Sequence, residues 1–197
     1  FVEQHKGTMI DQMQAMGFSA DWSKLKYTLD EDIVDIVLDT FKQLHEDGFI
    51  YRGNRIVNWD PVTQSAYADI ELKHVEQEDP LYTLDYGTIQ SATVRPETIF
   101  GDVAIAVNPN DARYTHLIGT DAVIPLIERP IPIIADEHVQ PDFGTGALKI
   151  TPGHDKNDYE VGLRHNLPQL TVIDFEGKMV NVPEEYAGLP VKEAREK

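Results

Sequence analysis

The sequence predicts a mixed α+β chain in which a helical segment precedes a domain of short, mostly antiparallel strands. Up to about residue 48, apolar residues recur at helical spacing. From about Ile70 they alternate in short runs, and Pro, Gly, Asn and Asp separate those runs. We therefore expect a helical piece of a neighbouring domain over residues 1–61, and a β-barrel-like or mixed sheet domain with few helices over residues 62–197.

Two helices are predicted in the first segment. Residues 1–17 place Met9, Ile10 and Met13 on one helical face, which we expect to be core, and Gly17 stands where a helix ends. Residues 28–31 have the T-x-x-E form of a capping box, and an apolar stripe follows over residues 34–44. A short strand over residues 55–59 should lead into the second segment.

The second segment contains runs with the two-residue period of strands. They cover Ile70 and Leu72, and residues 81–86, 103–107, 122–126, 131–135 and 147–151. The only clear long helix in this half should begin near Asp155 and stop at residues 166–168.

Composition limits the function. The 197 residues carry 34 acidic and 17 basic side chains, a formal net charge of −17, which argues against nonspecific binding of nucleic acid. No run of eighteen apolar residues is present, so we expect no contact with a membrane. Cysteine is absent, which fits a cytoplasmic location and excludes thiolate metal sites and a cysteine nucleophile. Because the first residue is Phe1 and not Met, we expect an excised fragment or a processed product.

The stretch FGTGALKITPGHDKND, residues 143–158, has the strongest functional pattern. Leu148 and Ile150 should point to the core, while Lys149 and Thr151 present an ammonium and a hydroxyl on the other face. The helix start at residues 155–158 adds two carboxylates, so the junction could hold a small zwitterion. Alternatively, these acids only cap the helix, and Gly-Thr-Gly is a plain turn. His154 with the two acids is a weak metal candidate, and we expect no metal.

A second unusual stretch, TVRPET, covers residues 93–98. Arg95 offers a planar set of donors for a carboxylate or phosphate, and Pro96 stiffens the backbone beside it. Glu97 and Thr98 could cap the turn that follows. A surface arginine in a turn remains an equally good interpretation of this stretch alone.

Together the two stretches resemble motifs of the valyl-tRNA synthetases. Residues 95–102 (RPETIFGD) resemble the RPET-x-x-GD motif, and residues 143–162 resemble the FGTGAxKITPxHDxNDxEVG motif. Shorter matches such as Val57-Asn58-Trp59 extend the resemblance over nearly the whole chain. Leucyl enzymes carry related RPDT-like and GTGAV-like motifs, and isoleucyl enzymes lack the Arg-Pro-Glu found here. Glu97 and the Lys-Ile-Thr run therefore favour the valyl family.

The resemblance implies an editing domain preceded by part of a Rossmann-type catalytic domain. Such an enzyme joins valine to tRNA(Val) using ATP and Mg, and its editing domain hydrolyses tRNA(Val) whose 3′ end wrongly carries threonine. Editing itself would need no cofactor, and the partners would be that tRNA end and the rest of the synthetase chain. The HIGH-like and KMSKS-like signatures of the synthetic site are missing, so this chain should not activate valine.

By motif match, we expect Asp158 to bind the substrate ammonium, and Lys149 and Thr151 to bind the threonine side chain and the reacting ester. Asp155 would order the loop or a water. The expected substrate-binding residues are Arg95, Glu97, Thr98, Phe143 and His154. Arg95 would contact the terminal ribose or phosphate, Phe143 would stack on the terminal adenine or wall the pocket, and His154 is a weaker candidate for the general base.

The sequence departs from the family at two places. Val94 stands where the family usually has Thr, which removes a hydroxyl next to the expected site. Many relatives have Cys-x-x-Cys after the Asn-Trp, whereas residues 60–63 here are Asp-Pro-Val-Thr and cannot hold zinc. Two alternatives therefore remain open: a noncatalytic module that binds a tRNA 3′ end or a protein, and an editing domain of leucyl or isoleucyl specificity.

Overall fold

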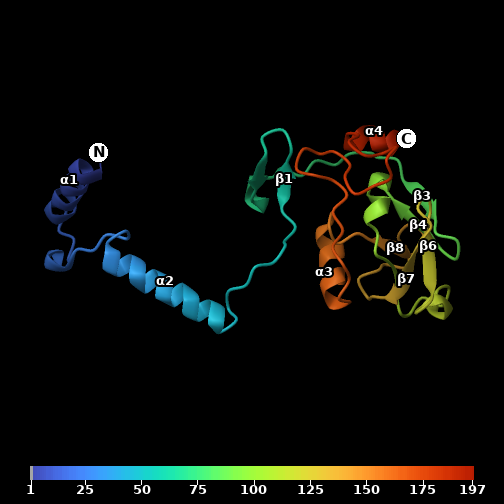
Figure 1. Cartoon of the computed structure of the whole chain (residues 1–197), viewed down its shortest axis with the longest axis horizontal. Helices are drawn as coiled ribbons and strands as arrows, with labels where there is room; N and C mark the ends of the chain where they lie inside the picture. Colours follow the sequence, from blue (N-terminus) through green and yellow to red (C-terminus); the bar gives the residue numbers. More distant parts are fainter. Residues whose placement is uncertain (1) are drawn as a thin grey trace. The chain divides into compact units, whose positions relative to one another are not determined.

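The computed structural model describes residues 2–197 and divides into two compact units, Phe1–Asn54 and Arg55–Lys197 (Figure 1). In the first unit the helices are α1 (Val2–Ala15) and α2 (Glu31–Glu46), with a 3-10 turn η1 (Trp22–Lys24) between them. Gly17 has a φ of +78°, as a helix-ending glycine requires. No residue of α2 is buried, and Met9 is 54% exposed, so the expected core face of this segment is open in the described chain.

The predicted capping box at residues 28–31 is wrong. The N-cap of α2 is Asp30, one residue before the helix, and its side chain makes no cap hydrogen bond. The Asp30 carboxylate accepts instead from the Tyr27 N–H at 2.9 Å. The Asp30 side chain therefore closes the turn at residues 27–30 instead of capping the first N–H groups of α2.

The second unit begins with two antiparallel hairpins. The first pairs β1 (Asn58–Asp60) with β2 (Ser65–Tyr67), and the second pairs β3 (Tyr82–Asp85) with β4 (Gln90–Thr93). The strand expected at Ile70 and Leu72 is wrong, because a 3-10 turn η2 (Asp69–Glu71) occupies that place and Ile70 is 94% exposed. Without a buried face, alternation alone did not make a strand there.

The main sheet has four strands in the order β6-β7-β5-β8. They are β5 (Ala104–Val107), β6 (Asp121–Ile124), β7 (Arg129–Ala135) and β8 (Ala147–Ile150). Only the β5–β7 pair is parallel. Four further elements complete the unit: 3-10 turns η3 (Pro96–Gly101) and η4 (Thr115–Leu117), and helices α3 (Lys156–Arg164) and α4 (Val191–Glu196).

The prediction of a mixed fold with few helices and mostly antiparallel strands is confirmed, but a closed barrel is not formed by the described strands. At the β8 edge of the sheet, the side chain of Ser91 takes the place of a backbone partner. The Ser91 hydroxyl, on β4, donates to the Ala147 carbonyl at 3.0 Å and accepts from the Lys149 N–H at 3.1 Å. A serine therefore links the β3–β4 hairpin to the four-stranded sheet.

Both faces of the sheet are core. Ile105 and Val107 of β5 pack in a cluster with Tyr86 and Met179, while Ala104 and Ala106 pack in a second cluster with Ile150 and Val161 of α3. The two-residue alternation of β8 is confirmed, since Ile150 and Ala147 belong to opposite clusters. The polar face of β8 is not open, however: Lys149 is 5% exposed and Thr151 is 2% exposed.

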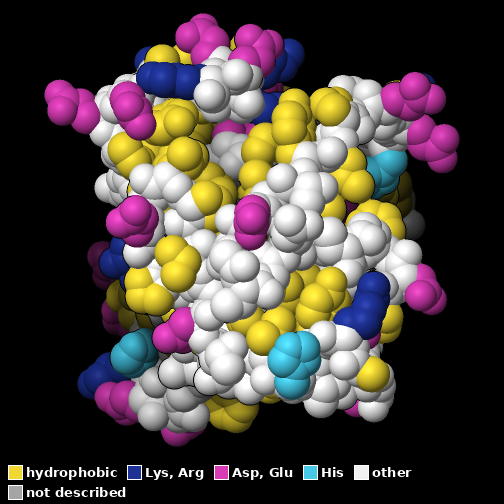
Figure 2. All heavy atoms as spheres, turned by 90° about the vertical axis from the view of Figure 1, so that its right-hand side faces the viewer, with side chains coloured by type: hydrophobic (Ala, Val, Ile, Leu, Met, Phe, Trp, Pro, Cys, Tyr) yellow, Lys and Arg dark blue, Asp and Glu magenta, His cyan; other side chains and the backbone are white. Residues whose placement is uncertain are grey.

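On the face drawn in Figure 2, acidic side chains are scattered, with most near the edge of the view and one near its middle. Within residues 2–197, no helix has the length and apolar character needed to cross a membrane.

Candidate functional site

A pocket of about 440 Å³ lies where β8 meets the start of α3. Its walls come from both motif stretches and from the loop before β8. The expected site residues that line it are Arg95, Thr98, Phe143, Lys149, Thr151, His154, Asp155 and Asp158. Glu97 is the expected site residue that does not line it.

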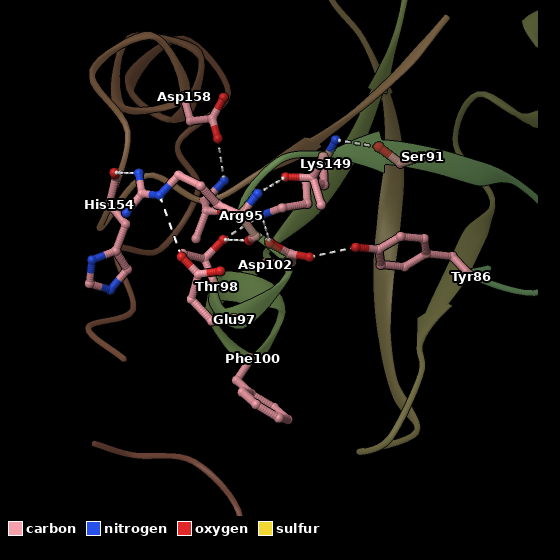
Figure 3. A network of polar contacts seen from close by, with 12 residues as sticks. Tyr86, Ser91, Arg95, Glu97, Thr98, Phe100, Asp102, Lys149, His154 and Asp158 are labelled. Carbon is pink, nitrogen blue, oxygen red and sulfur yellow. Dashed lines mark hydrogen bonds and ion pairs between the residues drawn. The ribbon is translucent and has the colours of Figure 1, made fainter. Parts of the chain in front are cut away.

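Lys149 lies at the base of this pocket, inside a network of polar contacts (Figure 3). Its ammonium donates to Asp102 Oδ1 at 2.7 Å, to the Thr151 hydroxyl at 2.7 Å and to the Thr98 hydroxyl at 2.9 Å. An ammonium has three donors, and all three are used within the protein. The geometry therefore supports Lys149 as the residue that orients the two threonine hydroxyls rather than as a free donor.

Asp102 is the centre of the network and was not among the expected site residues. Its side chain is fully buried, and it also accepts from the Thr151 hydroxyl at 2.6 Å and from the Tyr86 hydroxyl at 2.6 Å. Burial, together with the charge of Asp102, raises the pKa of Tyr86 far above its usual range, so Tyr86 remains a donor. The one signal in the sequence was the position of Asp102 at the end of the RPET-x-x-GD match.

Asp158 is buried at 7% exposure and lines the pocket from the first turn of α3. Its Oδ2 accepts from the Thr151 N–H at 2.8 Å, and no Lys, Arg or His of the described chain forms an ion pair with it. Burial raises the pKa of Asp158 to about 6, and the charge of Asp155 acts in the same direction. A carboxylate without a cation in such a position is well suited to an ammonium ligand.

Asp155 caps α3. Its Oδ1 accepts from the N–H groups of Asn157 and Asp158 at 2.8 and 3.1 Å, which confirms the N-cap predicted from the sequence. The two acids therefore have different roles. Asp155 caps the helix, whereas the carboxylate of Asp158 makes no capping bond and lines the pocket.

The ring of His154 points away from Asp158 and Lys149 (Figure 3). Its Nε2 accepts from the Val172 N–H at 2.8 Å. Burial lowers the pKa of His154 to about 4, and the charges of Arg95 and Lys149 add to this effect. At neutral pH the ring is neutral, and Nδ1 then carries the proton, so no lone pair is available for a general base.

The RPET stretch forms the N-terminal end of η3. Arg95 Nη1 donates to the His154 carbonyl at 2.9 Å, and Thr98 donates its hydroxyl to the Arg95 carbonyl at 2.9 Å. Glu97 points elsewhere: its buried carboxylate pairs with Arg195 of α4. Arg95 and Thr98 therefore line the pocket, whereas Glu97 does not line it and binds Arg195 instead.

Phe143 is 70% exposed at the pocket rim, on a loop held by the turn at residues 111–114. Arg113 Nη2 donates to the Pro141 carbonyl at 2.7 Å, and the Tyr114 hydroxyl donates to the Thr145 carbonyl at 2.8 Å. The two bonds bracket Phe143. Across the described residues, no group of His, Asp and Glu side chains is arranged to hold a metal ion.

Gly146 is the point where this loop is tightest, and replacing it with alanine should loosen the pocket rim. Its φ is +81°, and a Cβ would overlap Arg113 Nη2 and lie 2.8 Å from the Pro141 carbonyl oxygen. We expect Gly146→Ala to reduce the unfolding free energy by about 2–4 kcal/mol, from backbone strain plus a lost hydrogen bond. Gly87→Ala is the matched control, because φ is +84° with open space around the position, and should cost only about 1 kcal/mol. Equal losses in urea unfolding would contradict the role of the Arg113 contact.

Comparison with known proteins gives a consistent result. A family model described as tRNA synthetases class I (I, L, M and V) matches residues 1–181. A valine–tRNA ligase of Streptococcus agalactiae is 47% identical over 199 residues, covering 98% of this chain and 22% of the relative. That of Carboxydothermus hydrogenoformans is 46% identical over 201 residues, covering 99% and 23%. The chain thus spans about a fifth of the length of these curated relatives.

One solved structure, a ternary complex of Agrobacterium radiobacter K84 LeuRS with tRNA and LeuAMS, is 20% identical with a TM-score of 0.46. The match covers 98% of this chain and 34% of that one.

Proposed function

This chain belongs to the class I tRNA synthetases (I, L, M and V), and from that membership we propose that it is the editing part of a valine–tRNA ligase. In this proposal residues 62–197 hydrolyse the ester that joins threonine to the 3′ end of tRNA(Val). Residues 1–61 would be a fragment of the Rossmann-type catalytic domain. The longer enzyme would attach valine to tRNA(Val) in the cytoplasm with ATP and Mg, which serve its synthetic site.

The observation that carries the proposal is Asp158, a buried carboxylate that lines the pocket without an ion-pair partner. Burial of an unpaired charge costs free energy, and the raised pKa is the signature of that cost. An aminoacyl ester supplies the missing cation, because its α-ammonium is free. We infer that binding of this ammonium to Asp158 places the ester carbonyl near Thr151, whose N–H group is bonded to the same carboxylate.

Hydrolysis by a bound water fits this pocket better than a covalent intermediate. The Thr151 hydroxyl already donates its proton to Asp102 and accepts from Lys149 within the buried network, so it is not placed as a free nucleophile. His154 is likewise engaged through Nε2. In the proposed step, water attacks the ester carbonyl, the C–O bond to the ribose breaks, and the leaving ribose oxygen takes up a proton. The oriented hydroxyls and charges of the pocket would favour that transition state.

A second site is needed because threonine and valine are nearly isosteric. A hydrophobic pocket separates them by only about 10², a value known for valyl-tRNA synthetase itself rather than obtained from this structure. A site with polar groups placed for the threonine hydroxyl can do better, since valine would leave those groups unpaired. The hydroxyls of Thr98 and Thr151 each donate one hydrogen bond and accept one from Lys149. Each therefore keeps one lone pair that could accept from the threonine hydroxyl and that valine would leave unused.

The proposal predicts selective hydrolysis. With this chain, and with the longer enzyme, threonyl-tRNA(Val) should lose its ester faster than valyl-tRNA(Val), by roughly 10²-fold or more. The measurement is the rate of release of labelled amino acid from each tRNA. Preference for a leucyl or isoleucyl ester would assign the site to another synthetase of the same class.

A noncatalytic module that binds a tRNA 3′ end or a protein is the second candidate. It is favoured by Val94, which lines the pocket where a hydroxyl would be useful, and by the acidic composition. Such a module would retain threonyl-tRNA(Val) without shortening the lifetime of its ester. Hydrolysis of neither ester by the longer enzyme would favour this candidate.

A further inference from the structure

The buried carboxylate of Glu97 lies between two guanidinium groups from distant parts of the sequence. Arg195, on α4, makes a bidentate pair with it, with Nε to Oε2 and Nη2 to Oε1 both at 2.9 Å. Arg95 Nε lies 3.8 Å from Oε1. The Glu97 side chain is fully inaccessible, so this carboxylate needs a cation.

The two arginines have different positions in this cluster. Arg195 uses its planar donors on both oxygens of Glu97, the strongest geometry available to such a pair. Arg95 is beyond hydrogen-bond distance from Glu97, donates to the His154 carbonyl and lines the pocket with a side chain that is 42% exposed. Two cations and one anion leave one net positive charge in this cluster, and Arg95 is the more exposed of the two arginines, at 42% against 26% for Arg195.

We propose that Arg195 is a positioning residue that keeps the charge of Arg95 available to a phosphate group of the bound ligand. The inference rests on the proposed function for the identity of the ligand, a nucleotide at an RNA 3′ end. If Arg195 were neutral, the buried Glu97 would take Arg95 as its partner. Arg95 would then turn away from the pocket, and the net charge of the cluster would fall to zero.

The test compares the two halves of one ion pair. The probes are 3′-threonylamino-3′-deoxyadenosine with a 5′-phosphate and the same compound without it. The amide bond of both probes resists hydrolysis. Their binding to the full 197-residue chain is measured by calorimetry. The wild-type chain should bind the phosphorylated probe roughly tenfold more tightly, the effect of one charge-assisted hydrogen bond. Arg195→Gln should lose this preference, whereas Glu97→Gln should keep it, because the competing anion is gone.

Two further variants complete the design. Glu97→Gln/Arg195→Gln should regain the preference, and it remains informative if the single Arg195 variant does not fold. Arg164→Gln is the matched control, because Arg164 also pairs with a buried carboxylate, Asp136, but does not line the pocket; its phosphate preference should equal that of the wild type. Circular dichroism checks the folding of each variant.

The inference would be overturned if Glu97→Gln and Arg195→Gln changed the preference equally, as a purely structural pair would, or if the double variant folded without regaining it. It would also be overturned if the wild-type chain bound both probes alike. Failure of the proposed function is a separate result: threonyl-tRNA(Val) would survive, while the phosphate preference and its dependence on Arg195 would persist.

Discussion

Asp158→Asn should slow the hydrolysis of threonyl-tRNA(Val) by about 10- to 100-fold, because it removes the charge-assisted contact to the substrate ammonium. The same substitution should stabilise the fold at pH 7.5. Asparagine can still accept from the Thr151 N–H, but it carries no buried charge. The pKa difference between 3.8 and about 6 corresponds to roughly 3 kcal/mol at most, so we expect a gain of about 1–3 kcal/mol.

The pH dependence gives the sign of this effect. The folded protein holds the Asp158 proton more tightly than the unfolded chain, because burial raises its pKa to about 6. The contribution of Asp158 to the free energy of unfolding is therefore fully present below about pH 4, and it is lost as the pH rises through 6. The advantage of Asp158→Asn in urea unfolding should be near zero at pH 4 and reach its maximum above pH 7.

Asp136 provides the matched control, because it is also 7% exposed. Burial alone would raise its pKa, but hydrogen bonds from Arg164, the His138 N–H and His165 outweigh it and hold the pKa at about 2. Asp136→Asn should therefore destabilise the fold at pH 7.5. If both substitutions destabilised, Asp158 would have a structural role that the pocket does not reveal.

Lys149→Met should have the largest effect on stability, a loss of about 3–5 kcal/mol, because it leaves the carboxylate of Asp102 buried without its cation. It should also reduce selectivity for threonine, since the hydroxyls of Thr98 and Thr151 lose the donor that orients them. The measurements are urea unfolding and the ratio of threonyl to valyl ester hydrolysis at a temperature where the variant is folded.

A second substitution separates these two effects. In Lys149→Met/Asp102→Asn no charge is left unpaired, so more than half of the lost stability should return. The selectivity should stay low, because the threonine hydroxyls still lack the ammonium. Recovery of selectivity together with stability would mean that Lys149 acts only through the fold.

Local signals in the sequence predicted the strand β8 and the N-cap Asp155, because alternation and capping depend on residues within one turn or one strand. The contacts that organise the pocket could not be predicted in this way. Asp102 lies 47 residues from Lys149, and Arg195 lies 98 residues from Glu97. These pairs form only when the antiparallel β5–β8 pairing and the docking of α4 have brought their elements together.

The orientation of His154, the candidate general base, was also not predictable from neighbouring residues in the sequence. His154 stands beside two acids in the sequence, yet its ring turns to the Val172 N–H, which only the fold brings near. The expected barrel was also a matter of long-range pairing. The sequence located β3, β5, β6, β7 and β8, but it did not show which strands are neighbours.

The buried carboxylates of Asp102 and Glu97, each held by a cation, should limit how related sequences diverge. Lys149 should not change without Asp102, and Arg195 should not change without Glu97, because loss of either cation alone leaves a fully buried carboxylate without its hydrogen-bonded cation. In an alignment of relatives these pairs should vary together or not at all. Val94, which is 43% exposed and lines the pocket, belongs to neither ion pair, so we expect it to vary among relatives independently of the interior.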